Sequence, residues 1–129
     1  MAQNYFTLEE ATALLPRLRT EIAALRAENE ELARCRTQLA RLRALLRLNG
    51  HTAEALALEA RATDLLRAIG AQLDGLRMLG IELKDLEHGL VDFPSWREGR
   101  VVYLCWRLDE ERIGYWHELD AGFQGRQPL

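Results

Sequence analysis

The sequence has little of what disulfide frameworks, hydroxyl nucleophiles or membrane anchors require. Two cysteines, Cys35 and Cys105, are too few for a disulfide framework or a four-thiolate zinc site. Serine occurs once, at Ser95, so chemistry that depends on a serine nucleophile is not expected. No run approaches the ~20 apolar residues that cross a bilayer, and residues 1–6 lack the basic and apolar regions of a signal peptide. We therefore expect a cytoplasmic protein with no membrane segment.

An excess of positive charge is also missing. Lysine and arginine together number 17 against 20 acidic residues, which gives a net charge of -3. This balance lacks the electrostatic footprint of a duplex DNA binder, so nucleic acid is not an expected partner. The sequence contains no P-loop, Rossmann fingerprint, nucleophile elbow or HExxH motif.

The composition changes near Gly80. Residues 1–80 contain 34 alanines and leucines and only two aromatic residues, whereas residues 81–129 contain seven aromatic residues. A chain of this length supports one core. We predict a single domain, 1–129, in which 1–80 form a helical arm and 81–129 form a small β-sheet with a C-terminal tail.

The first predicted helix begins with a capping box. Thr7 is the expected N-cap, and Glu10 follows three residues later. Pro16 lies too deep for a first-turn proline, so we expect a kink or a break there. Leucine recurs every seven residues, the spacing of a seam that faces a partner helix. The seam leucines are Leu18, Leu25, Leu32, Leu39 and Leu46.

A second helix is predicted from about Ala53 to Leu79. Asn49 and Gly50 favour the end of the first helix, and Thr52 is a cap for the second. Its apolar stripe consists of Leu58, Ala62, Leu65, Ile69, Leu73 and Leu76. Because two helices alone leave part of each stripe exposed, we expect the arm to pack against a second copy of the chain in a homodimer.

Beyond residue 80 the pattern indicates three or four short antiparallel strands. If residues 109–111 form a three-residue hairpin loop, Cys105 lies opposite Tyr115 and Tyr103 lies opposite His117. One face then carries the mainly apolar Val102, Leu104, Trp106, Leu108, Gly114 and Trp116 and covers the helices. The opposite face carries Val101, Tyr103, Cys105, Arg107, Ile113, Tyr115 and His117. A register slip of one residue would exchange the two faces. The predicted fold is α+β, a long antiparallel helical hairpin followed by a small antiparallel sheet.

Several stretches resemble a bacterial family known as domain of unknown function 2203. They are 84–94 (KDLEHGLVDFP), 102–108 (VYLCWRL), 115–123 (YWHELDAGF) with 125–126 (GR), 5–11 (YFTLEEA) and 14–16 (LLP). The resemblance covers nearly the whole chain. It implies a shared fold but supplies no activity, because none is established for that family.

The strongest cluster for chemistry is centred on His117. Imidazole, thiolate and carboxylate bind transition metals, and the predicted pairing makes Cys105 a diagonal neighbour of His117. Glu118 and Asp120 are further candidate ligands, although Glu118 points away from His117 on a strand. The alternative is a histidine hydrogen-bonded to a tyrosine or to the backbone. No cofactor is required by the sequence, and a divalent transition metal is the one candidate.

Three other features permit function beside a plainer structural role. Asp85 and Asp92 flank Gly89 and suit either acid-base chemistry or turn formation. Trp96 lies in a loop-like segment, where it serves either a partner interface or the core. Arg126, in the tail, either helps to bind an anion or belongs to a strap that closes over the sheet.

Taken together, these patterns favour a non-enzymatic, oligomeric binding or adaptor protein that uses its C-terminal sheet. The predicted contact surface for a protein or small-molecule partner consists of Tyr103, Arg107, Trp96, His117 and Arg126. The alternatives are a metal- or small-molecule-dependent enzyme or sensor centred on His117 and Cys105, with Asp85 and Asp92, and an RNA-associated protein that stacks bases on sheet aromatics.

Overall fold

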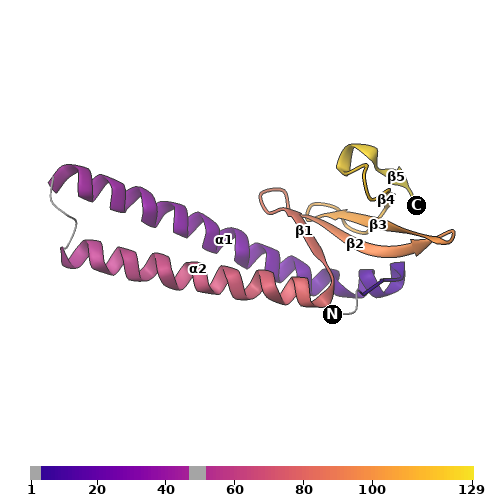
Figure 1. Ribbon diagram of the computed structural model, residues 1–129, viewed down its shortest axis with the longest axis horizontal. Coiled ribbons are helices and arrows are strands. Elements are labelled where there is room, and N and C mark those ends of the chain that lie inside the picture. The colour runs from indigo at the N-terminus through magenta and orange to yellow at the C-terminus, as the bar shows by residue number, and fades with distance from the viewer. Residues whose placement is uncertain (1–3, 47–51) are drawn as a thin grey trace. The chain divides into compact units, whose positions relative to one another are not determined.

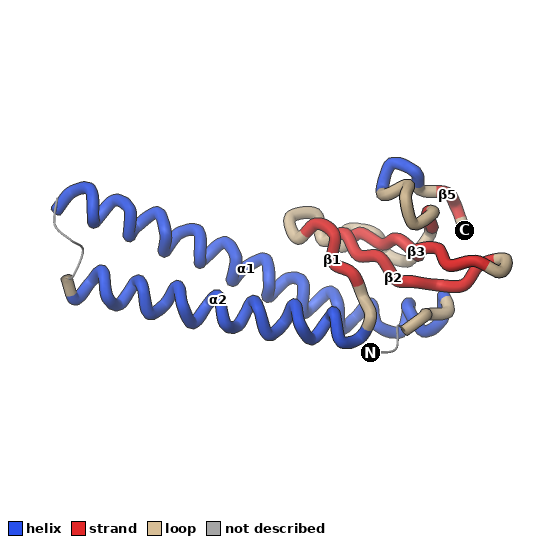
Figure 2. Tube along the Cα trace, in the orientation of Figure 1, coloured by secondary structure: helices blue, strands red, loops and turns tan. Residues whose placement is uncertain are grey.

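The computed structural model describes residues 4–46 and 52–129 and confirms the α+β class. Two long helices precede a five-stranded antiparallel sheet (Figures 1 and 2). The chain divides into two compact units. One is Ala24–Gln72, a helical unit, and the other joins the sheet to the remaining parts of both helices. No helix in the described ranges combines the length and apolarity needed to cross a membrane.

Helix α1, Leu8–Leu46, begins with the predicted capping box. The backbone N–H of Thr7 donates to Glu10 at 2.9 Å, and the N–H of Glu10 donates to the Thr7 hydroxyl at 3.0 Å. The helix continues through Pro16, so of the two expected outcomes the break does not occur, and the kink stays a prediction. An interior proline costs about 3 kcal/mol, and burial of Leu15 and Leu18 on either side of it offsets this cost.

Helix α2, Ala53–Leu79, has the predicted bounds. The Thr52 hydroxyl accepts a hydrogen bond from the N–H of Ala55 at 3.1 Å, as a helix cap does. Asn49 and Gly50 lie outside the described residues. In the helical unit the two helices share a small core of Leu32, Cys35 and Leu65, flanked by Leu58, Ala62 and Ile69.

The leucine seam is already covered within one chain. Leu18 and Leu25 are fully buried, and Leu32 and Leu39 are nearly so. Leu46, whose side chain lies outside the described part, adds nothing to this comparison. Burial of these leucines therefore does not require a second copy of the chain. The homodimer stays a prediction, to be checked by light scattering against the chain mass of 14.8 kDa.

The sheet has one strand more than the predicted maximum of four. Its strands follow one another in chain order as an antiparallel meander: β1 (Glu82–Asp85), β2 (Leu90–Arg97), β3 (Arg100–Arg107), β4 (Tyr115–His117) and β5 (Gln127–Pro128). Strand β5 has two residues, too few to show any alternation in the sequence. The predicted pairing of β3 with β4 is confirmed: Tyr103 lies opposite His117, and Cys105 lies opposite Tyr115.

The turn between β1 and β2 depends on Gly89. This residue has φ of 64°, in the left-handed region, and a Cβ there would lie 2.6 Å from the Cβ of Leu108. Only glycine meets both conditions without strain. The turn sends the chain into β2, which carries Asp92 toward the middle of the sheet.

The two faces of the sheet differ as predicted. Phe93 and Trp106, both fully buried, face the start of α1. The ring of Phe6 meets that of Phe93 edge to face at 5.5 Å, and the Arg19 guanidinium lies 5.4 Å from the Trp106 ring centroid. The opposite face carries Tyr103, Cys105 and His117, which alternate with these residues along the strands.

Candidate metal site on the sheet

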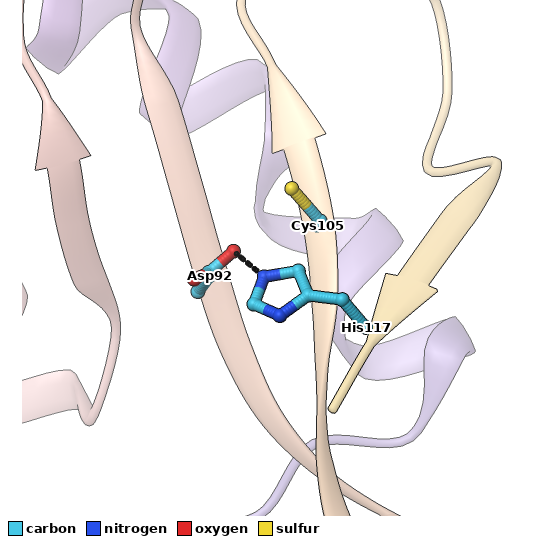
Figure 3. A group of neighbouring side chains, drawn as sticks. All are labelled: Asp92, Cys105 and His117. Carbon is cyan, nitrogen blue, oxygen red and sulfur yellow. Dashed lines mark hydrogen bonds and ion pairs between the residues drawn. The ribbon is translucent and has the colours of Figure 1, made fainter. Parts of the chain in front are cut away.

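Three metal-ligating side chains meet on the face that points away from α1. Asp92 comes from β2, Cys105 from β3 and His117 from β4 (Figure 3). Asp92 pairs directly with Cys105, and His117 lies diagonally from Cys105 across the next pair of strands. One ligand atom of each lies within 4.8 Å of the others, and all three residues are buried.

Hydrogen bonds hold the His117 ring over the central strand. Nδ1 lies 2.7 Å from the backbone carbonyl oxygen of Glu118, and Nε2 lies 3.0 Å from Oδ1 of Asp92. Because a carbonyl oxygen only accepts, Nδ1 carries a proton. Nε2 faces Asp92 and is the ring nitrogen that could bind a metal ion. The backbone contact confirms the predicted alternative for this histidine, and it is also the bond that orients histidine ligands in metal sites.

The carbonyl group that orients His117 belongs to Glu118, whose side chain is held by an ion pair. The Glu118 carboxylate pairs with the guanidinium of Arg100 on β3, at 2.5 Å between Oε1 and Nη2. This pair lowers the pKa of Glu118 through the hydrogen bond from Arg100. Glu118 thus contributes its backbone to the site and directs its carboxylate elsewhere, so the structure does not bring this predicted ligand to His117.

Burial keeps the two neighbouring hydroxyl and thiol groups protonated. Burial first, and then the charge of Asp92, raises the pKa of the Cys105 thiol to about 12. Burial and a hydrogen bond with Glu82 raise the pKa of Tyr103 to about 12. The metal-free thiol is therefore a poor nucleophile at neutral pH, which argues against a thiolate-imidazole catalytic pair. A bound metal ion would displace the thiol proton.

A cavity of about 320 Å³ adjoins the cluster. Asp92, Tyr103 and His117 form one wall, and the segment from Leu119 to Phe123 forms another. Asp120, predicted as a ligand, lies in that segment. It therefore borders the same cavity as His117 but lies outside the close group of three.

Asp92 and Asp85, which flank the Gly89 turn in the sequence, have different partners in the structure. Asp85 contacts His88, with 2.7 Å between Oδ2 and Nδ1. Asp92 instead pairs with Glu82 on one side and Cys105 on the other. The signal that could have found it is the alternation along 90–97, which places Asp92 on the same face as Cys105 once β2 is paired with β3.

Four of the five residues predicted to form a partner surface lie near one another. The ring centroids of Tyr103 and His117 are 5.4 Å apart. The guanidinium groups of Arg107 and Arg126 lie 5.4 and 4.7 Å from the centroid of the Phe123 ring, and Phe123 lines the same cavity as Tyr103 and His117. Trp96 lies on strand β2 rather than in the predicted loop and is 59% exposed, and its ring contacts that of Tyr5 at 5.3 Å with a tilt of 51°. Arg107, on β3, pairs with Asp109 at 2.6 Å and borders a second cavity of about 300 Å³ with Asp85 and His88. His117 is buried and Tyr103 half-buried.

Arg126 is a structural residue in this fold. Nη2 donates to both carboxylate oxygens of Glu110, at 2.6 and 2.9 Å, and to the carbonyl oxygen of Cys105 at 3.2 Å. Its guanidinium lies 4.1 Å from the centroid of the Tyr115 ring. These contacts fasten the C-terminal segment over the sheet, as the predicted strap would require.

The fold and the cluster together define an α+β protein with an aspartate, a cysteine and a histidine gathered on its sheet. The family described as "Uncharacterized conserved protein (DUF2203)" matches residues 4–129. The chain therefore belongs to that family, as its motifs indicated. Neither the curated proteins nor the solved structures contain a significant match to it.

Proposed function

We propose that this chain is a binding protein for a divalent transition-metal ion of the zinc class. The observation that carries the proposal is the convergence of Asp92, Cys105 and His117, buried and within 4.8 Å of one another. Three strands contribute one ligand type each. Because the strands are paired, the ligands stand on a rigid support rather than on loops.

The chemistry of the ligands selects the metal class. A thiolate and an imidazole favour zinc or a similar transition metal over magnesium or calcium, which prefer oxygen ligands. A carboxylate and a thiolate would also neutralise a doubly charged ion. This matters because an uncompensated charge is costly at a buried site.

The second layer of contacts supports the same conclusion. Histidine ligands commonly donate their other ring N–H to a carbonyl or carboxylate group. His117 does this through Nδ1 to the Glu118 carbonyl, which leaves Nε2 directed at Asp92. No rotation of the ring is needed to present Nε2 as a ligand.

Three protein ligands leave one coordination position vacant, as in catalytic rather than structural zinc sites. The proposal is therefore compatible with a sensor or an enzyme and does not require either. A role as an adaptor for a protein partner stays a prediction. The RNA alternative also stays a prediction, since Trp106 and Trp116 are buried but Trp96 and Tyr115 are exposed aromatic residues on the sheet.

Metal analysis of untagged protein tests this function. The wild-type chain is expected to retain close to one equivalent of zinc after dialysis against metal-free buffer, and the single variants His117→Ala, Cys105→Ser and Asp92→Asn are expected to lose it. His88→Ala and Cys35→Ser are matched controls, since neither residue belongs to the close group of Asp92, Cys105 and His117. Wild-type protein that holds no metal after zinc loading would overturn the proposal, as would retention by all three variants.

A further inference from the structure

The cavity beside the cluster shares two of the three ligands. Asp92 and His117 line it, whereas Cys105 is fully buried and, among the described residues, is not part of its wall. A metal ion held by all three would thus have the cavity on the side away from the sulfur. The vacant coordination position would open into that cavity.

The polar part of the cavity wall carries one cation, Lys84, together with His117 and two carboxylates, those of Asp92, a proposed metal ligand, and the exposed Asp120. The proposed metal ion and Lys84 are the positive groups that an anionic head group would meet. Lys84, from β1, lies on the wall, and its ammonium group is 2.8 Å from Glu82 and 5.3 Å from the centroid of the Tyr103 ring. An ammonium group has three donors. Glu82 uses one of them, so Lys84 can still donate to a ligand oxygen.

Apart from Asp120, the rest of the wall is apolar and incompletely covered. Leu90, Leu119 and Phe123 line the cavity. Leu119 is 54% exposed and Phe123 is 39% exposed, which is high for large apolar side chains beside a cavity. The apolar body of a ligand would remove this surface from water. At about 320 Å³, the cavity is at the small end of ligand sites.

We propose that the vacant metal position takes the carboxylate of a small molecule with a short apolar body. The metal ion and Lys84 bind the carboxylate, and Leu90, Leu119 and Phe123 contact the body. This inference rests on the proposed function, because the metal supplies one of the two contacts to the head group. No bond is made or broken in this binding step.

The test uses the full chain loaded with cobalt(II), whose visible absorption reports its ligands. In a Cys35→Ser background, where Cys105 is the sole thiol, a thiolate-to-cobalt charge-transfer band first establishes that Cys105 binds the metal. Titration with butyrate is then expected to change the visible bands with saturation. Acetate, which lacks the longer body, is expected to bind more weakly, and butyramide, which lacks the charge, is expected to leave the bands unchanged.

Two variants separate the parts of the proposed ligand site. Lys84→Met keeps the stem and removes the ammonium group, so it should weaken butyrate about tenfold, the value of one charge-assisted hydrogen bond. Phe123→Ala should weaken butyrate more than acetate. Both variants should retain the charge-transfer band, since neither residue is a ligand.

The outcomes distinguish the two proposals. Absence of the charge-transfer band overturns the metal-binding function and this inference with it. A normal band with no response to butyrate overturns the inference alone and leaves metal binding standing. An equal response to butyrate and butyramide, or an unchanged butyrate affinity in Lys84→Met, overturns the assignment of a carboxylate head group.

Discussion

Nε2 of His117 lies 3.0 Å from Oδ1 of Asp92, although 25 positions of sequence separate the two residues. Strand β3 lies between their strands, and the imidazole reaches across it. His117→Ala would leave the buried carboxylate without this partner. Breaking a buried pair in this way costs about 3–5 kcal/mol, and urea unfolding of the metal-free protein should show that loss.

His88→Ala is the control for this measurement. His88 also contacts an aspartate, Asp85, but on the exposed surface. Its removal should shift the urea midpoint far less, because exposed ion pairs contribute little. Equal shifts of the urea midpoint for the two variants would show that burial does not make the His117–Asp92 pair contribute more to stability than an exposed pair.

The thiol of Cys105 is expected to be unreactive in the folded, metal-free protein. With its pKa raised to about 12, about one molecule in ten thousand carries the thiolate at pH 8. A Cys35→Ser background leaves Cys105 as the sole thiol. Labelling by iodoacetamide should then be slow in native buffer and fast in urea. Fast labelling of the folded chain would show that the site is open and the thiolate accessible.

Much of the fold could be predicted because its signals are local. The capping residues Thr7 and Thr52 lie beside the helices that they start. The pairing of Cys105 with Tyr115 was found by counting back from an assumed three-residue loop at 109–111. The register is confirmed, but the loop is not, because β3 ends at Arg107 and β4 begins at Tyr115.

The candidate site was only half predicted, because the turn that places its other half was not recognised. Cys105 and His117 were found through the β3–β4 register. Asp92 enters through the register of β2 against β3, which a two-residue turn at Glu98 and Gly99, both with positive φ, sets. The sequence predicts a loop in this part of the chain, so the register was not counted. The position of the C-terminal segment was likewise hidden, since β5 is two residues long and Arg126 acts through its contacts with Glu110.

The capping box of α1 is expected to stabilise the unit that contains the sheet and the start of α1. Thr7→Ala removes the hydroxyl that accepts the N–H of Glu10, and loss of such a cap costs about 1 kcal/mol. Thr63→Ala is the matched control, because the Thr63 hydroxyl bonds only to the Glu59 carbonyl within its own helix. Urea unfolding should show the loss for Thr7→Ala. A loss of equal size for Thr63→Ala would exclude capping as the cause.

The exposed pair of Asp85 and His88 should make stability depend on pH. The hydrogen bond with Asp85 raises the pKa of His88 above its ordinary value of 6.5, and the same contact lowers the pKa of Asp85 below 3.8. A raised histidine pKa stabilises the fold fully below the unfolded value, and the gain is lost as pH rises through the folded value. The aspartate contribution is present above its unfolded value and is lost in stronger acid.

His88→Gln should therefore destabilise the protein at pH 5.5 and have a smaller effect at pH 8.5. Urea midpoints of wild type and variant at the two values measure this difference. An NMR titration should place the His88 pKa above 6.5 in wild type and lower it in Asp85→Asn. A difference between variant and wild type that grows at alkaline pH would contradict the sign.

Arg126 is expected to control how firmly the C-terminal segment covers the site. The side chain of Arg126 is 11% exposed, and that of its partner Glu110 is 17% exposed. Arg126 also donates a hydrogen bond to the backbone carbonyl oxygen of Cys105. Arg126→Met keeps much of the stem but leaves Glu110 without this cation, at a cost of about 2 kcal/mol. Hydrogen exchange should quicken at Leu129, whose N–H donates to Gly114 next to β4.

Metal release should quicken for the same reason. The segment that Arg126 holds also forms a wall of the cavity beside Asp92 and His117, so a chelator should remove cobalt severalfold faster from Arg126→Met than from wild type. Arg126→Lys should not restore the slow rate, because an ammonium group lacks the planar guanidinium face that lies 4.1 Å from the centroid of the Tyr115 ring and 4.7 Å from that of Phe123. Rescue by lysine would show that charge alone, rather than this geometry, keeps the segment closed.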